Sequence, residues 1–404
     1  MTRPELLDLV TRMVRVDSRT PVEERLARLM ADEIRGAGFE PEWFEVAPGR
    51  PNVCCSARLG PGPGLVTLTG HLDTVDVAQG WGSDPFEPTV RDGRLYGLGA
   101  LDMKSGVACA WLAFRRLVER AGSSPSLGRV GFAATVDEEA FGTGARALLD
   151  TPYGKSDLLL LTEPFSGRDA TDPIPLVMPG KILYRIIVEG RSSHALCHPE
   201  RGINAVDEAA RIVLALAQLP LGSHPVLGPM NYSTLKIDGG YREYATVVPE
   251  RCEIIVTRLL APGETRATAV EQLEALIASL TLAARVTVEV APPSYEPFEI
   301  AADHPGVVAF REAFQARHGV PPVFGGLLGI TDANIYQPEG GIPAVIFGPT
   351  GRGLHEKDEY VELDSLDPVV DILVDTTIRY FSASPHGRGQ PAAAGGATRQ
   401  GRAP

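Results

Sequence analysis

Apolar strand-like segments that alternate with helices constrain the fold of this chain most. Such segments occur at 52–59, 65–69, 129–136 and 157–162, and the last of these is nearly continuous leucine. A helix is expected from about Ser105 to Glu119, where apolar residues recur at helical spacing. Strands that are apolar on both faces must be covered on both sides. The pattern therefore predicts an α/β domain with a mostly parallel sheet that is flanked by helices.

The pattern changes after Gly180. Residues 181–290 read as strand, helix, strand, strand, helix and strand, which is the order of a ferredoxin-like α+β module. A Pro-rich segment at 291–298 then leads back to helix and strand patterns like those of the first part. We therefore predict a catalytic domain built from 1–180 and 291–383, with a lid domain, 181–290, inserted into it.

Composition limits the partners of this chain. Its 404 residues include 38 basic and 51 acidic side chains, and a net charge of −13 argues against nucleic acid or an anionic membrane as the main partner. No apolar run reaches the roughly 18–20 residues of a membrane span, and the charged, amphipathic first segment is typical of a helix and not of a secretory signal. Five cysteines form no framework and fit a reducing compartment, so we expect a cytoplasmic protein. The Gly-, Ala- and Pro-rich tail, 384–404, is predicted to be disordered.

Polar residues stand where two buried segments end. His71 follows the strand at 65–69, and ligand sites of α/β sheets collect at the carboxyl ends of strands. Asp73 could hydrogen-bond the second ring nitrogen of His71, although a structural histidine at a strand end is the alternative. Asp102 follows a glycine-rich turn before a helix, where an N-cap or turn aspartate is the more ordinary interpretation of that residue alone.

A run of acids is harder to explain without a cation. Asp137, Glu138 and Glu139 follow an apolar strand, where adjacent carboxylates repel each other and lose hydration. A solvated acidic loop is the competing interpretation. Glu163 follows the most apolar strand, and His355 lies in a loop after the strand at 342–347. Carboxylate and imidazole ligands without cysteine suit Zn, Mn or Co, so the residues predict a metal site.

Five motifs occur together in a recognisable order. They are GHLDTV at 70–75, GLGALDMKSG at 97–106, DEEAFGTGA at 137–145, TEP at 162–164, and the late His355. Over residues 5–382 the chain resembles the M20 metallopeptidase and aminoacylase family, which includes acetylornithine deacetylase, succinyl-diaminopimelate desuccinylase, aminoacylase-1 and glutamate carboxypeptidase. The resemblance implies a zinc-exopeptidase-like catalytic domain with an inserted lid and dimerisation domain.

The resemblance also implies a dinuclear metal site. Two divalent ions, usually Zn with Co or Mn as alternatives, would be bridged by Asp102. One ion would add His71 and Glu163, and the other would add Glu139 and His355. The peptide bond after Asp102 is cis in this family.

Catalytic roles follow from the same resemblance. Glu138 matches the general base that takes a proton from metal-activated water, and Asp73 matches the residue that orients His71. His194 matches a lid histidine that reaches the site from the partner subunit and stabilises the oxyanion, which implies a homodimer. The neighbouring His198 is interpreted as structural.

Three residues are carried over as substrate ligands. Arg258 matches a lid arginine that binds the substrate carboxylate, although Val256 replaces the usual acid two positions earlier. Thr246 stands where the family tends to have asparagine, and Asn334 stands in place of the usual arginine in the segment 329–336. These departures leave the substrate open without touching the metal ligands.

We therefore expect a metal-dependent hydrolase that acts on an amide bond. The leading hypothesis is a deacylase of a small N-acyl amino acid. A dipeptidase or carboxypeptidase with the same site is the nearest alternative, because both need a carboxylate clamp and an amide at the metals. A non-catalytic binding relative would have lost a ligand or Glu138, and neither is lost here.

Overall fold

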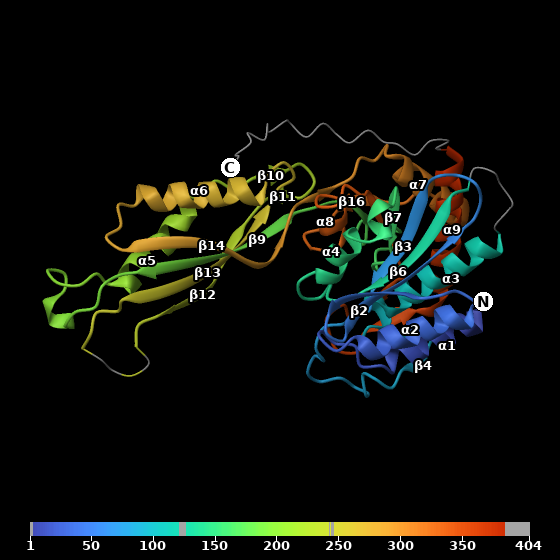
Figure 1. The fold of residues 1–404 in the computed structure, drawn as a ribbon, viewed down its shortest axis with the longest axis horizontal. Coiled ribbons are helices and arrows are strands. Elements are labelled where there is room, and N and C mark those ends of the chain that lie inside the picture. The colour runs from blue at the N-terminus through green and yellow to red at the C-terminus, as the bar shows by residue number, and fades with distance from the viewer. Residues whose placement is uncertain (1–2, 121–126, 242, 244–245, 384–404) are drawn as a thin grey trace, which may run out of the picture.

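A computed structural model describes residues 3–120, 127–241, 243 and 246–383. The tail for which we predicted disorder, 384–404, lies outside the described residues. Within them, two bodies are joined side by side, a larger catalytic domain and an elongated lid that projects away from it (Figure 1). No helix in the described residues is long and apolar enough to cross a membrane. All five cysteines are described and are free thiols, as expected.

The catalytic domain is organised by one mixed sheet. Four of its six strands run parallel, and the two at one edge are antiparallel to their neighbours. The predicted fold class is confirmed, although the first edge strand carried no clear apolar pattern and was not anticipated. In sheet order, the strands are β1 (Glu42–Ala47), β2 (Arg50–Arg58), β6 (Arg129–Thr135), β3 (Leu65–His71), β7 (Leu158–Leu161) and β17 (Ala344–Ile346).

Helices cover both faces of this sheet (Figure 1). The larger group packs around Trp111, whose ring stacks on Phe114 at 5.4 Å between centroids. This group contains α1 (Arg3–Val14), α2 (Glu24–Gly36), α3 (Ser105–Glu119), α7 (Pro305–His318) and α9 (Leu366–Ala383). The face toward the lid carries the shorter helices α4 (Thr143–Leu149) and α8 (Ala333–Tyr336).

Smaller sheets complete the catalytic domain. One of them, at the edge of the site, joins β18 (Gly351–Arg352), β19 (Tyr360–Glu362), β5 (Arg94–Tyr96) and β4 (Thr89–Arg91). Another joins β15 (Phe298–Glu299), β8 (Ile174–Met178) and β16 (Phe324–Gly326). A two-stranded sheet of β10 (Ser223–His224) and β11 (Gly228–Pro229) lies within 181–290, the segment predicted as the lid. The first sheet matters for function, because it draws two loops that are far apart in sequence to the same edge of the site.

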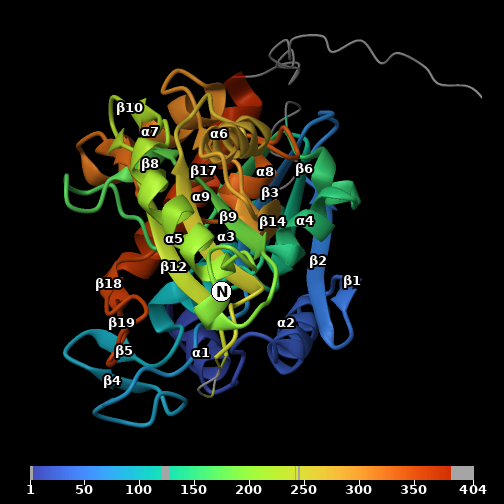
Figure 2. The same ribbon diagram turned by 90° about the vertical axis from the view of Figure 1, so that its left-hand side faces the viewer.

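The lid is a four-stranded antiparallel sheet with two helices on one face. Its elements are β9 (Gly180–Glu189), α5 (Ala205–Ala215), β12 (Tyr232–Gly239), β13 (Arg251–Leu260), α6 (Arg266–Ser279) and β14 (Arg285–Tyr295). The strand order β12-β13-β9-β14 is the ferredoxin-like order that the pattern predicted. Alternate residues of β9 and β13 are buried under the helices, which explains the alternation of their sequences. Figure 2 views the molecule from the lid side.

The chain passes between the domains twice. The catalytic core and the lid core are separate hydrophobic clusters, and the lid cluster draws its residues from 182–288. The first passage is at Pro179. The second follows β14, which continues to Tyr295 through a register shift inside the Pro-rich segment 291–298. The exact domain boundaries stay a prediction.

Candidate metal centre

The predicted ligands meet at the carboxyl edge of the parallel strands. His71 is the last residue of β3, while Glu139 and Glu163 follow β6 and β7. Asp102 lies in the tight turn that precedes α3, and His355 lies in the loop between β18 and β19. Parallel strands end at one edge, so three segments that are distant in sequence arrive there together.

His71 is buried and directs one ring nitrogen at two carboxylates. Its Nε2 atom lies 3.2 Å from Asp102 Oδ1 and 3.9 Å from Glu163 Oε1. Its Nδ1 atom lies 2.9 Å from the main-chain oxygen of Asp73, which fixes the ring. The Asp73 carboxylate is farther away, with Oδ1 at 3.6 Å. The expected contact to the imidazole is therefore made by the Asp73 main chain and not by its side chain.

The Asp73 carboxylate instead holds the acidic loop. It accepts hydrogen bonds from the main-chain N–H groups of Glu138 at 3.2 Å and Glu139 at 3.0 Å, and from the Thr20 hydroxyl at 2.7 Å. Asp73 thus fixes the backbone that carries the predicted general base. The resemblance implied that Asp73 orients His71, but it did not indicate that the Asp73 carboxylate binds the acidic loop.

Asp102 is shared by the two histidines. While Oδ1 faces His71, Oδ2 lies 3.1 Å from His355 Nε2, and that nitrogen is also 3.1 Å from Glu139 Oε2. Two groups of potential ligand atoms, each within 4.8 Å of one another, result: His71, Asp102 and Glu163, and Asp102, Glu139 and His355. They coincide with the two sets that the resemblance implied. The peptide bond after Asp102 is cis, as expected.

The three adjacent acids have separated. Asp137 turns away from the ligands and pairs with Arg50 at 2.7 Å, and its carboxylate also accepts from Thr143. Glu138 and Glu139 remain at the site, and Glu138 lies with His71 and Glu139 in a third group of potential ligand atoms within 4.8 Å. The expected repulsion among these three carboxylates is therefore relieved for Asp137 only.

The site concentrates negative charge away from water. Burial raises the pKa values of Glu138 and Glu163 well above their usual range. Burial alone would lower the pKa of His71, but the hydrogen bond to Asp102 and the nearby carboxylates raise it well above normal. Hydrogen bonds to Asp102 and Glu139 raise the pKa of His355 to about 10. The carboxylates therefore favour positive charge in their midst.

An unpartnered atom supports a cation at this position. Glu163 Oε1 is buried and has no hydrogen-bond partner among the residues that the structure describes. A buried carboxylate oxygen without a donor is costly, and a cation would remove that cost. Imidazole nitrogens and carboxylate oxygens are ligands that Zn, Mn and Co accept. The residues present therefore fit a pair of divalent ions.

Two further buried acids were missed by sequence reasoning. Asp332 precedes α8 and accepts from Thr135 Oγ1 at 3.4 Å, and burial raises its pKa to about 7. Glu359 accepts from main-chain N–H groups of the turn that carries Asp102, and burial raises its pKa to about 7. Asp332 lies near Asn334 in the segment 329–336, and Glu359 lies in the loop of His355. The sequence did not indicate that either acid is buried, because single acids in loops are usually exposed.

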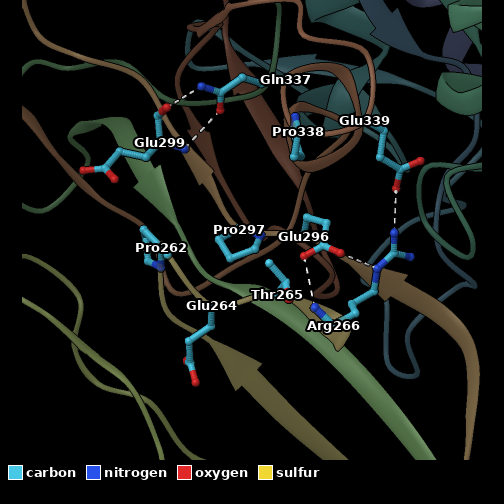
Figure 3. A pocket seen from close by; sticks show the side chains of 11 residues that line it. Pro262, Glu264, Thr265, Arg266, Glu296, Pro297, Glu299, Gln337, Pro338 and Glu339 are labelled. Carbon is cyan, nitrogen blue, oxygen red and sulfur yellow. Dashed lines mark hydrogen bonds and ion pairs between the residues drawn. The ribbon is translucent and has the colours of Figure 1, made fainter. Parts of the chain in front are cut away.

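A cleft adjoins the metal centre. Its cavity volume is about 650 Å³, and it is lined by Leu101, Pro164 and Leu354, each next in sequence to one of the ligands. A second cavity of about 630 Å³ lies at the domain junction, where Arg266 pairs with Glu296 at 2.6 Å (Figure 3). Neither cavity is lined by a predicted site residue, but only the first has lining residues that stand next to the ligands in sequence, so the first is the better candidate for substrate.

His194 and Thr246 lie together at the far end of the lid. The main-chain oxygen of Thr246 accepts from Ala195 N at 3.0 Å. His194 is exposed and follows the end of β9, a strand that spans roughly 30 Å from the domain junction. Its Nδ1 accepts from Leu196 N at 3.2 Å, so the neutral ring carries its proton on Nε2.

The other two predicted substrate ligands are engaged elsewhere. Arg258 is sealed beneath α6, where Nη2 donates to Glu264 at 2.6 Å and Gln272 at 2.7 Å. The Nδ2 atom of Asn334 donates to the main-chain oxygens of Pro179 at 3.0 Å and Glu296 at 2.9 Å. The structure does not bring these side chains to Thr246. Their roles in binding substrate stay predictions.

Comparison with known proteins decides the family. The sequence model of Peptidase family M20/M25/M40 matches residues 67–379. The chain belongs to this family. A curated relative named succinyl-diaminopimelate desuccinylase, from Methylorubrum populi, is 30% identical over 388 residues, which cover 93% of this chain and 98% of the relative. The predicted class, a hydrolase of amide bonds in this family, is confirmed.

Solved structures of the family share the fold. Aminopeptidase PepT from Bacillus cereus superposes with a TM-score of 0.75 at 22% identity, over 95% of this chain and 99% of that chain. The YXEP protein of Bacillus subtilis, described as a dinuclear metal binding peptidase of the M20 family, superposes with a TM-score of 0.67 at 16% identity, over 93% and 97%. These likenesses confirm the α/β domain with an inserted lid.

Proposed function

We propose that this member of the family removes the acyl group from a small N-acyl amino acid, in a site that binds two divalent cations. The observation that carries the proposal is the pair of ligand groups that share Asp102. The ions are Zn, with Co or Mn as alternatives. The desuccinylase relatives, which match the chain from end to end, favour a deacylase over a peptidase.

When bound, the cations would polarise the amide carbonyl and lower the pKa of a water. Glu138 takes the proton of that water and later returns it to the leaving amine. Two features of the chain suit Glu138 to this role: burial raises its pKa, and Asp73 fixes its main chain. Burial keeps competing water away from the proton transfer.

A small substrate fits the cleft beside the ligands. Its volume of about 650 Å³ lies in the range of small-molecule pockets. The oxyanion that forms during attack needs a hydrogen-bond donor, and we assign it to Nε2 of His194 from a second copy of the chain. The proposal includes a homodimer, because His194 stands at the far end of its own lid.

The experiment combines metal analysis with a substrate panel. Purified protein should hold two equivalents of metal and release acyl groups from N-succinyl or N-acetyl amino acids. Glu138→Gln should keep its metal and lose roughly 100- to 10,000-fold in kcat. Glu119→Gln, at an exposed acid at the end of α3 away from Asp102, is the control and should keep wild-type rates.

Two results would count against the proposal. Cleavage of dipeptides, with no release of any acyl group, would assign the dipeptidase alternative. Equal rates for wild type and Glu138→Gln on every amide tested would remove Glu138 as the base.

A further inference from the structure

The loop that carries His355 also carries a buried carboxylate that reaches the opposite side of the site. The exposed fraction of Glu359 is 2%. Its Oε1 atom accepts from the main-chain N–H groups of Leu101 at 2.7 Å and Asp102 at 2.9 Å, and its Oε2 atom accepts from that of Gly99 at 2.9 Å. One side chain therefore binds three N–H groups of the turn before α3.

The shape of this turn makes those groups available. Gly99 has a φ of +75°, a conformation that favours glycine, and a Cβ there would lie 2.5 Å from Thr74. The main chain of Glu359 adds a fourth contact, since its oxygen accepts from Gly97 N at 3.0 Å. Buried N–H groups require acceptors, and Glu359 supplies them for this turn.

The held turn is the one that fixes Asp102. Each Asp102 oxygen faces a different histidine, at 3.2 Å from His71 and 3.1 Å from His355. A small rotation of the turn would break this symmetry and separate the two ligand groups. Glu359 is four residues after His355, so one loop sets the position of both the ligand and the turn.

A buried lysine accompanies the carboxylate. Lys104 is fully buried, its Nζ atom donates to Val16 O at 2.9 Å, and it attracts Glu359 electrostatically. The anchor of the turn is thus a charged group with an opposing charge nearby, as buried ions require.

We propose that Glu359 is a positioning residue for Asp102, and that it sets the affinity of the site for its shared pair of cations. Asp102 bridges correctly only while Glu359 holds the N–H groups of Gly99, Leu101 and Asp102. The inference rests on the proposed two-cation site. Supporting residues of this kind typically change metal affinity by about 10- to 100-fold when replaced.

The test titrates Co²⁺ and Zn²⁺ into metal-free protein by calorimetry. Glu359→Gln has nearly the same shape but loses one acceptor oxygen, and we expect it to bind the cations about 10- to 100-fold more weakly than wild type. Its kcat should fall, and excess metal should restore it. Glu362→Gln, three residues later and bonded to Thr350, is the matched control and should bind metal normally.

The outcomes separate this inference from the proposed function. If wild type itself binds no divalent cation, the proposed function fails. If wild type binds two and Glu359→Gln binds them with equal affinity, the positioning role is overturned. A purely structural role would lower the melting temperature of the metal-free variant and leave its metal affinity unchanged. Should Glu359→Gln not fold, Glu359→Asp keeps the charge but shortens its reach, and it must show the same weakening.

Discussion

The catalytic edge and the lid differ in how completely one chain builds them. At the catalytic edge, five side chains from distant segments converge within 4.8 Å in two groups that share Asp102. In the lid, the predicted contributors are spread out: His194 is exposed at the far end, and Arg258 is sealed beneath α6. A single chain thus brings the proposed cation ligands together but does not bring its own His194, the proposed oxyanion donor, to them.

The two sheets explain this difference. Parallel strands deliver all their carboxyl ends to one edge, so residues that follow β3, β6 and β7 become neighbours. In the lid, β9 and β13 pair side by side and antiparallel, so the carboxyl end of one strand lies beside the amino end of the other, and roughly 30 Å separates the two ends of β9. The proposed cation ligands therefore lie together within one domain, whereas residues at the two ends of a lid strand lie far apart.

Loss of the shared ligand should have the largest effect. Asp102→Asn removes the charge that both ligand groups use, so both cations should bind weakly and activity should fall by about 1,000-fold or more. Metal content and rate together check this. Glu119→Gln, at an exposed acid at the end of α3, serves as the control. If Asp102→Asn retained one firmly bound ion and half the wild-type rate, the two ligand groups would be independent of each other.

Removal of the lid histidine should leave the metals in place. We expect His194→Ala to lose roughly 100- to 1,000-fold in kcat, the cost of one oxyanion donor, with normal metal content. The decisive measurement mixes His194→Ala with Glu138→Gln after subunit exchange. If His194 acts across a dimer, hybrid dimers contain one intact site, and about a quarter of wild-type activity should return.

The mixing experiment can contradict the proposal that the lid supplies a residue to the site of a second copy. A strictly monomeric active enzyme, or no return of activity in fully exchanged hybrids, would mean that His194 acts within its own chain or not at all. Exchange itself should be verified with two differently tagged wild-type chains. If His194 does not act at all, the donor must be another group.

Sequence alone predicted the parts that repeat a strong local pattern. The buried strands before His71 and Glu163 predicted both the sheet and the edge at which the site lies. The alternation of apolar and polar residues in β9 predicted the lid sheet. Contacts between side chains and distant segments could not be predicted from the sequence. The Asp73 carboxylate binds the acidic loop, and Glu359 binds a turn more than 250 residues earlier. Spacing in the sequence does not predict such contacts, because the two partners become neighbours only in the folded chain.

The next prediction concerns Asn334, whose side chain links the two segments at which the chain passes between the domains. Asn334→Ala should lower the free energy of unfolding by about 1–3 kcal/mol, because it leaves the buried oxygens of Pro179 and Glu296 without donors. Metal affinity should not change. Gln337→Ala, which removes exposed hydrogen bonds to Glu299 at the same junction, should cost less. A large rise in KM with unchanged stability would instead favour the predicted role in substrate binding.

The smallest effect should appear in the pH dependence of the metal-free protein. Burial raises the pKa of Asp332 from about 4 to about 7 in the folded state, so the folded chain binds this proton more tightly than the unfolded chain. Its stabilising contribution is complete below the unfolded pKa and is lost as pH rises through the folded pKa. Asp332→Asn should therefore match wild type only below about pH 4, gain stability relative to it as the pH rises to about 7, and melt a few degrees higher near pH 8.

Bound cations should shrink that difference, because positive charge at the catalytic edge stabilises ionised Asp332. Melting curves of both proteins, with and without Zn²⁺, measure this. The lid offers the control: Glu253 is only partly buried and is paired with Arg185 at 2.7 Å, so Glu253→Gln should show no comparable gain in stability near pH 8. An equal gain in both variants would mean that charge is no more concentrated at the catalytic edge than in the lid.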